Sequence, residues 1–227
     1  DCADGLSGLH VTQDTHLPLD IAHPGWWQDA AGASPPPFTV ITATEVGRGR
    51  WIPADPSLAT WAAHYLQRLE ERGKYQLVIW PEHCLIGGWG ADLHPAVFTA
   101  VNGWSRRRRR QVRFHRKGLN PLTEHYSALE AEVPHEADPA TRADPQLLAE
   151  LAAADHLIVA GEALSHCVAG TVRDLVRLLG AEIAPRLTLL VDCTSPVAGF
   201  ERQGQEFLAE MAALGVQFRR STQGLPA

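Results

Sequence analysis

Four groups of residues have the types and spacing to do chemistry, and the first surrounds Cys167. In "HLIVAGEALSHCVAGTVRDLVRLLG" (156–180) an apolar run gives way to a short turn, and the cysteine follows where a helix is predicted to begin. A thiol at a helix start meets unpaired backbone N–H groups and the positive end of the helix dipole, which favour the thiolate. The same N–H groups could hold an oxyanion. A lone cysteine is more often a small buried residue, and on these residues alone that alternative is favoured.

The second group lies in "QDTHLPLDIAHPGWW" (13–27). Asp14 and His16 alternate across a predicted strand end and would point the same way, and His23 follows in the loop. Carboxylate and imidazole ligands together suit zinc, iron or manganese. Because the chain has 11 histidines, chance clustering is an equal alternative.

The third and fourth groups each follow a predicted strand. "VIWPEHCLIGGWGADLHP" (78–95) places His83 near Trp80, which would either stack on a flat substrate or close the core. "FHRKGLNPLTEHYSAL" (114–129) contains Lys117, whose ammonium could lower the pKa of a nearby thiol. The alternative for Lys117 is an ordinary surface turn.

Helices and short apolar strands alternate along the chain. Apolar spacing and end signals predict helices at 56–72, 92–104, 145–154, 166–179 and 201–214, and strands at 75–80, 111–115, 156–160, 187–192 and "VQFR" (216–219). This order predicts an α/β fold, a three-layer α/β/α domain with a mainly parallel sheet covered on both faces. In such sheets the active-site residues usually lie in the loops beyond the carboxyl ends of the strands, and His83, Cys167 and Asp192 occupy such positions.

Two segments stand apart from this alternation. Residues 24–55 are rich in Pro and Gly, and we predict a long inserted loop that holds a short hairpin. The five arginines at 106–110 predict a solvated run at a helix end, because the chain as a whole is acidic.

Length, composition and net charge limit which classes of protein the chain can belong to. A chain of 227 residues with 45% hydrophobic residues predicts one domain over 1–227. The net charge of −6 gives no reason to expect nucleic acid or an anionic membrane as partner, so a small-molecule partner is favoured. With no apolar run of about 20 residues and no secretory signal, we predict a cytoplasmic protein. The four widely spaced cysteines predict free thiols.

Together the motifs resemble one family. "VTQDTH", "WPEHC" followed by "GADLHP", "KGLNPLTEHYSAL", "AGEALSHCV" and "DCTSPV" occur in the order found in the isochorismatase-like cysteine hydrolases, and within them the nicotinamidases. The resemblance runs from about residue 8 to 200. "HPGWW" and "KGLNPLTEHYS" look most like a longer bacterial subgroup with an inserted loop. Because all these motifs match together, we favour a catalytic Cys167 over the alternative that it is only a small buried residue.

The resemblance implies a reaction and roles for five residues. Cys167 would attack nicotinamide and form a thioester, giving nicotinate and ammonia, a step of NAD salvage. Lys117 would stabilise the thiolate, and the backbone N–H groups of Ala163 and Cys167 would form the oxyanion hole. The Glu162–Ala163 peptide matches one that is cis in relatives, and Glu162 and Trp80 match substrate-side positions.

The resemblance also implies a metal site and partners. Asp14, His16 and His83 match the metal ligands of nicotinamidases, with His23 a fourth ligand or a neighbour of the ligands. Zinc is expected first, with iron and manganese as alternatives. The metal would bind the pyridine nitrogen of the substrate and water. Relatives often assemble, so a homo-oligomer is a further expected partnership.

One departure from the family pattern leaves alternatives open. Relatives begin with a strand ending in an aspartate, within "DxQNDF", that serves as general acid and base; here 13 residues precede Asp14, and Asp1 and Asp4 do not match. We expect an N-terminally incomplete member, in which proton transfer would lose a factor of about 10² to 10⁴. The alternatives are a hydrolase of another small amide, carbamoyl compound or ester, and a catalytically impaired metal-binding or interaction protein.

Overall fold

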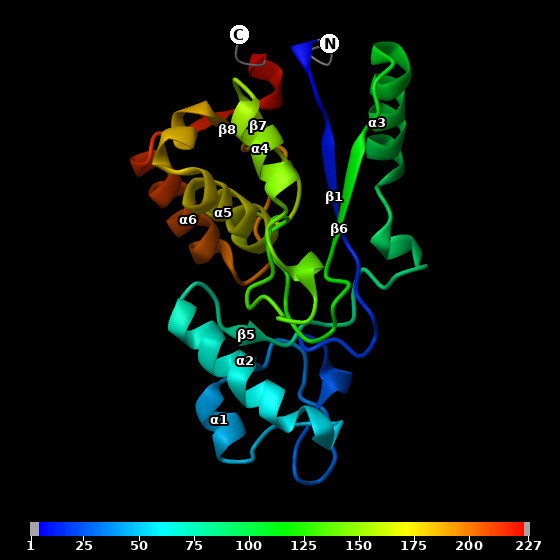
Figure 1. Ribbon diagram of the computed structural model, residues 1–227, viewed down its shortest axis with the longest axis vertical. Coiled ribbons are helices and arrows are strands. Elements are labelled where there is room, and N and C mark those ends of the chain that lie inside the picture. Colours follow the sequence, from blue (N-terminus) through cyan, green and yellow to red (C-terminus); the bar gives the residue numbers. More distant parts are fainter. Residues whose placement is uncertain (1–4, 225–227) are drawn as a thin grey trace.

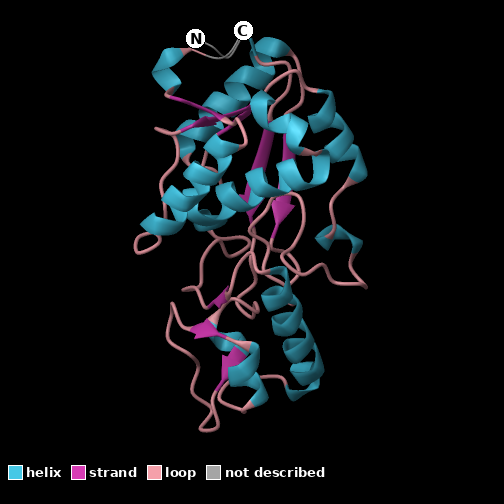
Figure 2. Cartoon of the chain, turned by 90° about the vertical axis from the view of Figure 1, so that its left-hand side faces the viewer, coloured by secondary structure: helices cyan, strands magenta, loops and turns pink. Residues whose placement is uncertain are grey.

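The computed structural model describes residues 5–224, which form two lobes (Figure 1). The upper lobe holds parallel strands with helices packed around them, and the lower lobe holds short antiparallel strands and two helices (Figure 2). The helices of the upper lobe are α3 (Pro95–Arg108), α4 (Pro145–Ala153), α5 (Ala169–Leu179) and α6 (Glu201–Ala213). This mixture of helices and mainly parallel sheets is the predicted three-layer α/β arrangement.

The parallel strands fall into two sets. In the first, β1 (His10–Asp14) pairs with β6 (Arg113–Lys117), in a register that sets Asp14 beside Lys117. In the second, the order is β7 (Leu157–Val159), β8 (Leu187–Leu190) and β9 (Gln217–Arg219). The predicted helices and strands of this lobe are confirmed to within a few residues at each end.

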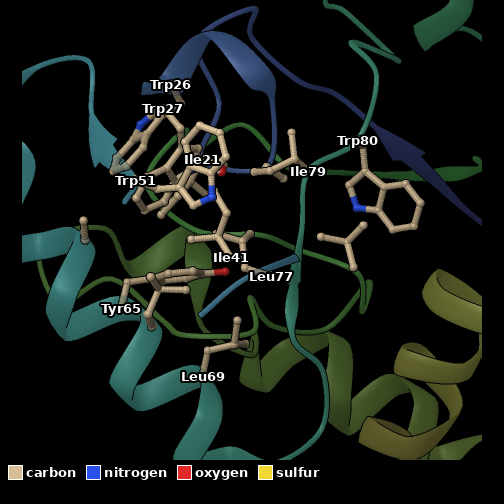
Figure 3. Packing of buried hydrophobic residues seen from close by; sticks show 14 of the residues in the cluster. Ile21, Trp26, Trp27, Ile41, Trp51, Tyr65, Leu69, Leu77, Ile79 and Trp80 are labelled. Atoms are coloured by element: carbon tan, nitrogen blue, oxygen red, sulfur yellow. The ribbon is translucent and has the colours of Figure 1, made fainter. Parts of the chain in front are cut away.

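The lower lobe corrects the prediction for residues 24–55. The segment is not a plain loop, because it contributes β2 (Trp27–Gln28), β3 (Val40–Ile41), α1 (Ala43–Gly47) and β4 (Ile52–Pro53). The predicted hairpin has its counterpart in the antiparallel pairing of β2 with β4. Trp27 is fully buried and Trp51 is 7% exposed, so the segment builds a hydrophobic core despite its Pro and Gly content (Figure 3).

The strand predicted at 75–80 also differs. Only β5 (Leu77–Val78) forms a ladder, and it runs antiparallel to β3 rather than joining the parallel strands. Leu77 and Ile79 pack into the lower core (Figure 3). Helix α2 (Ala59–Arg72) covers this core with the predicted face, which includes Tyr65 and Leu69, and ends at Gly73 in the left-handed conformation.

The molecule has two main hydrophobic clusters. The lower cluster includes Ile21, Trp27 and Tyr65, and the upper cluster includes Leu189 and Phe207. Because each lobe packs around a cluster of its own, the single domain over 1–227 stays a prediction. Within residues 5–224, no helix has the length and apolar character needed to cross a membrane.

Candidate active site and metal centre

Lys117 lies between the thiol of Cys167 and the carboxylate of Asp14 at the end of β1. Its Nζ lies 3.5 Å from Cys167 Sγ and 3.1 Å from Asp14 Oδ1, and it donates a hydrogen bond of 2.7 Å to the carbonyl oxygen of His125. Asp14 and Lys117 end the paired strands β1 and β6, and Cys167 lies in the π-helical turn Leu164–Val168 that leads into α5. The carboxyl ends of the strands therefore converge on one site, as the sequence predicts.

The electrostatics of Cys167 differ from the predicted thiolate. Burial raises the pKa of the thiol, the Lys117 ammonium lowers it, and the carboxylates of Asp14 and Glu124 raise it further, so that it reaches about 11. At pH 7 about one molecule in 10⁴ then carries a thiolate. The prediction that Lys117 favours the thiolate is right in sign, but burial and the two carboxylates outweigh it.

This pKa predicts how Cys167 reacts with iodoacetamide. Only the thiolate is alkylated, so the rate at Cys167 should rise about tenfold per pH unit from pH 7 toward 11 and level off above it. The Cys167→Ala variant reports the background from the other three cysteines of the chain. A rate that levels off near pH 7 would show that the thiol is already ionised.

The turn before Cys167 carries the predicted oxyanion donor. The peptide between Glu162 and Ala163 is cis, as the resemblance implies. Among the described residues the N–H of Ala163 has no hydrogen-bond acceptor, so it is free to bind a ligand oxygen. The carboxylate of Glu162 accepts hydrogen bonds from the N–H of Ser195 at 2.9 Å and its hydroxyl at 3.1 Å. Glu162 thereby ties the turn to the segment after β8.

Asp14, His16 and His83 form the one group of three or more His, Cys, Asp or Glu side chains within residues 5–224 that has metal-binding geometry. One ligand atom from each lies within 4.8 Å of the others. His16 is 1% exposed, and its Nε2 lies 3.1 Å from Asp14 Oδ1, yet both atoms are buried without a geometrically sound hydrogen bond. Buried polar atoms normally have partners, so these two facing acceptor atoms are suited to binding a common cation.

The histidine rings are oriented as metal ligands usually are. Nδ1 of His16 faces Asp20 Oδ2 at 3.0 Å, Nδ1 of His83 faces the carbonyl of Pro81 at 2.9 Å, and Nδ1 of His23 faces the carbonyl of Leu17 at 3.1 Å. A proton held on Nδ1 leaves the lone pair of Nε2 for a metal. His23 Nε2 lies 3.3 Å from His83 Nδ1, so His23 stands beside the three clustered side chains.

The charge on His16 also fits a cation site. Burial alone would lower its pKa, but the adjacent carboxylates of Asp14 and Asp20 outweigh burial and raise it to about 11. A protonated His16 thus balances two carboxylates, a charge that a divalent ion can replace. The donor set of one carboxylate and imidazoles suits zinc, iron and manganese.

Asp20 is a site residue that the motif reasoning missed. It is fully buried, its Oδ2 faces His16 Nδ1, and its Oδ1 accepts the N–H of Ala22 at 2.9 Å. Asp20 lies four residues after His16 in the same motif, but an Asp in a loop usually makes a local turn, so its type and position alone do not indicate a site residue.

Asp20→Asn should weaken metal binding without unfolding the protein. An Asn side chain offers one oxygen and one NH₂, so it cannot accept hydrogen bonds from both His16 Nδ1 and Ala22 N–H. An NH₂ facing His16 would move the imidazole proton to Nε2, the ligand atom. We expect metal affinity to fall by about 10- to 100-fold, measured by competition with a chelating dye. Unchanged affinity would remove Asp20 from the site.

Gly118 allows the backbone to pass close to the cluster. It has φ +80°, and a Cβ there would lie 3.0 Å from both Asp14 Oδ1 and His16 Cε1. Gly118→Ala should therefore lower metal affinity by displacing both side chains. Gly32→Ala is the matched control, because Gly32 has φ +82° with no atom within 4 Å of the added Cβ. Equal metal affinity in the two variants, measured by titration, would contradict this role.

Trp80 lies among aromatic rings beside the thiol turn. It is 7% exposed, its indole N–H donates to the Tyr126 hydroxyl at 2.9 Å, and its ring centroid is 4.9 Å from that of His166 and 5.5 Å from that of Phe200. These contacts are those of a packed side chain, and the predicted contact of Trp80 with a substrate ring stays a prediction.

Two buried groups near Lys117 were quoted in a motif but not recognised. Burial raises the pKa of Glu124 to about 7, and one of its carboxylate oxygens has no partner among the described residues. Burial together with the Lys117 charge lowers the pKa of His125 to about 3. Asp192, at a strand end, is exposed, and its carboxylate accepts hydrogen bonds from the N–H and hydroxyl of Ser221.

The comparisons with known proteins bear on the fold. No family model and no curated sequence matches the chain. Among solved structures, the chain is similar to a nicotinamidase and pyrazinamidase of Acinetobacter baumanii, with 21% identity, a TM-score of 0.61, and coverage of 97% of this chain and 81% of that one. The yeast nicotinamidase gives 18% identity, a TM-score of 0.62, and coverage of 96% and 82%.

A third similar structure is a protein of L. infantum in complex with nicotinate, with 20% identity, a TM-score of 0.52, and coverage of 99% and 81%. The shared class is the three-layer α/β fold. More particularly, the chain has the fold of the nicotinamidases.

Proposed function

We propose that the chain is a cysteine amidohydrolase that binds a divalent metal ion and converts nicotinamide to nicotinate and ammonia. The observation that carries this proposal is the position of Lys117, 3.5 Å from Cys167 Sγ and 3.1 Å from Asp14 Oδ1. The Lys117 ammonium thereby contacts both the proposed nucleophile and a member of the proposed metal-binding cluster. Solved structures of this fold bound to nicotinaldehyde and nicotinate support a pyridine ligand.

The proposed reaction runs through a thioester. Cys167 Sγ adds to the carboxamide carbon, the C–N bond breaks, and the proton of the thiol leaves with ammonia. Water then cleaves the C–S bond, releasing nicotinate and restoring the thiol. The N–H of Ala163, which has no acceptor within residues 5–224, would donate to the oxyanion at each addition step.

Lys117 has an electrostatic role in this proposal. Burial opposes its charge, but the neighbouring Asp14 and Cys167 outweigh burial and raise its pKa above the usual range. Lys117 therefore stays protonated, and it stabilises the thiolate rather than accepting the proton. Asp14 is a poor proton acceptor too, since Lys117 and His16 outweigh its burial and hold its pKa far below the usual range.

The metal would be held by Asp14, His16 and His83, with His23 as a fourth ligand or as a support for His83. A bound ion would supply a Lewis-acidic anchor for the ring nitrogen of the substrate. The ligands would then set the distance between that anchor and Cys167, which makes the site selective for a ring that carries both groups.

Ammonia release from nicotinamide and from benzamide tests the proposal. The two substrates share the carboxamide, but benzamide has no ring nitrogen for the metal. The metal-loaded protein should prefer nicotinamide, and chelation should remove that preference. Equal rates would favour a hydrolase of other small amides, and no release from either by a folded, metal-loaded sample would contradict the amidohydrolase.

A further inference from the structure

A cavity of about 400 Å³ lies between the two lobes, and we call it the inter-lobe cavity. Its walls come from the end of α2 in the lower lobe and from α5 and α6 in the upper lobe (Figure 1). This volume is within the range of small-molecule sites. Neither Cys167 nor Lys117 lines the cavity, and none of the clustered metal-ligand candidates does, so it is separate from the candidate active site.

The inter-lobe cavity is lined by charged and apolar side chains. Cationic side chains outnumber carboxylates, with Arg72, Lys74, Arg173 and Arg177 against Asp174 and Glu210. The apolar side chains are Val176, Met211 and Leu214. An excess of positive charge beside an apolar wall suits one class of ligand, a small organic anion with an apolar body.

The arginines of α5 keep N–H donors for such a ligand. Arg177 donates through Nε to Asp174 and through Nη2 to Glu130, and its Nη1 has no acceptor within residues 5–224. Arg173 donates through Nε and Nη2 to one oxygen of Glu210, at 2.8 and 2.7 Å, and the Glu210 side chain is 46% exposed. Because exposed ion pairs are weak, a ligand anion can replace Glu210 as the partner of Arg173.

Arg173 also connects the inter-lobe cavity to the thiol turn. Its Nη1 donates to the Tyr75 hydroxyl at 3.4 Å, and that hydroxyl donates to the carbonyl oxygen of His166 at 3.2 Å. His166 immediately precedes Cys167, and its ring is stacked on that of Tyr75, with the centroids 5.9 Å apart. A ligand that moves the Arg173 guanidinium would therefore change the hydrogen bonding of the turn that carries the thiol.

We propose that the inter-lobe cavity is a second ligand site, which binds a small organic anion and thereby alters the reactivity of Cys167. Arg173 and Arg177 would hold the carboxylate or phosphate group of the ligand. The aliphatic or aromatic body would pack against Met211 and Leu214. This inference does not depend on which reaction Cys167 performs.

Binding can be followed at Met211, the one methionine in the sequence. Its isotope-labelled methyl signal, identified by its absence from Met211→Leu, should shift saturably with hexanoate and with hexyl phosphate. The ratio of the two affinities measures which anionic group the cavity prefers. Hexanol, which has the same apolar body without the charge, should bind at least about tenfold more weakly than hexanoate.

Arg173→Gln should lower the affinity for hexanoate at least about tenfold, because it removes the charge and the fork of N–H donors. Arg202→Gln is the matched control, since Arg202 is an arginine of α6 that is 81% exposed and lies outside the cavity wall. A Met211 signal that does not move, equal binding of hexanol, or equal affinity in the two variants would overturn the inference.

The rate of alkylation of Cys167 by iodoacetamide tests the link to the thiol. Saturating hexanoate should change this rate at least about twofold. Tyr75→Phe keeps the ring but removes the hydroxyl, so the change should disappear in this variant. A rate that hexanoate leaves unchanged, or changes equally in Tyr75→Phe, would refute the effect on Cys167. Both experiments measure binding or alkylation rather than hydrolysis, so their result is separate from that of the proposed function.

Discussion

Replacing Cys167 with Ala should reduce ammonia release from nicotinamide by at least about 10³-fold, because the proposed thioester forms on its sulfur. The substitution removes one sulfur atom from a half-buried position, so the fold and the metal site should persist. Metal content and the thermal midpoint measure that persistence. Loss of activity with metal retained would assign the loss to the nucleophile.

The matched control is Cys193→Ala. Cys193 is also a free, half-buried cysteine that follows a parallel strand, but its Sγ faces Asp192 rather than Lys117. This variant should keep the activity of the parent protein. If Cys167→Ala were as active as Cys193→Ala, the nucleophile would have to be sought elsewhere.

Replacing His16 with Ala should abolish stable metal binding. His16 is central to the cluster, with Nε2 3.1 Å from Asp14 Oδ1 and Nδ1 3.0 Å from Asp20 Oδ2. Its loss removes one ligand and leaves the buried carboxylate of Asp20 without its counter-charge, so metal affinity should fall by about 10²-fold or more. Metal content after dialysis measures this directly, and ammonia release should fall with it.

His64→Ala is the control for His16→Ala, because His64 is an exposed histidine on α2, far along the chain from the cluster. It should keep full metal content. A His16→Ala protein that retained one metal ion per chain would contradict the assignment of this site, whatever its activity.

Local sequence signals predicted the helices α2 to α6 and the strands of the upper lobe well, and the strands of the lower lobe poorly. Helices such as α2 and α5 carry their apolar spacing within one segment, so their positions follow from local pattern. Residues 24–55 were misjudged because Pro and Gly signal a loop, whereas burial of Trp27 and Trp51 depends on partners elsewhere in the chain. The antiparallel pairing of β5 with β3 was not predicted either, because it also depends on a partner elsewhere in the chain.

In the candidate site too, local motifs were predicted and effects of burial were not. Asp14, His16, His83, Lys117 and Cys167 were predicted from motifs, and the structure brings all five together. Asp20 and Glu124 were missed because their significance lies in burial and in partners, which a single sequence does not display. The raised pKa of the thiol was missed on the same ground: a nearby lysine is visible in the motif, but the competing burial and carboxylate charge are not.

The raised pKa of Cys167 also bears on the lifetime of the protein. Hydrogen peroxide oxidises thiolates, so a thiol that is almost wholly protonated at pH 7 reacts slowly with it. The burial that raises this pKa therefore slows the formation of sulfenic acid at Cys167.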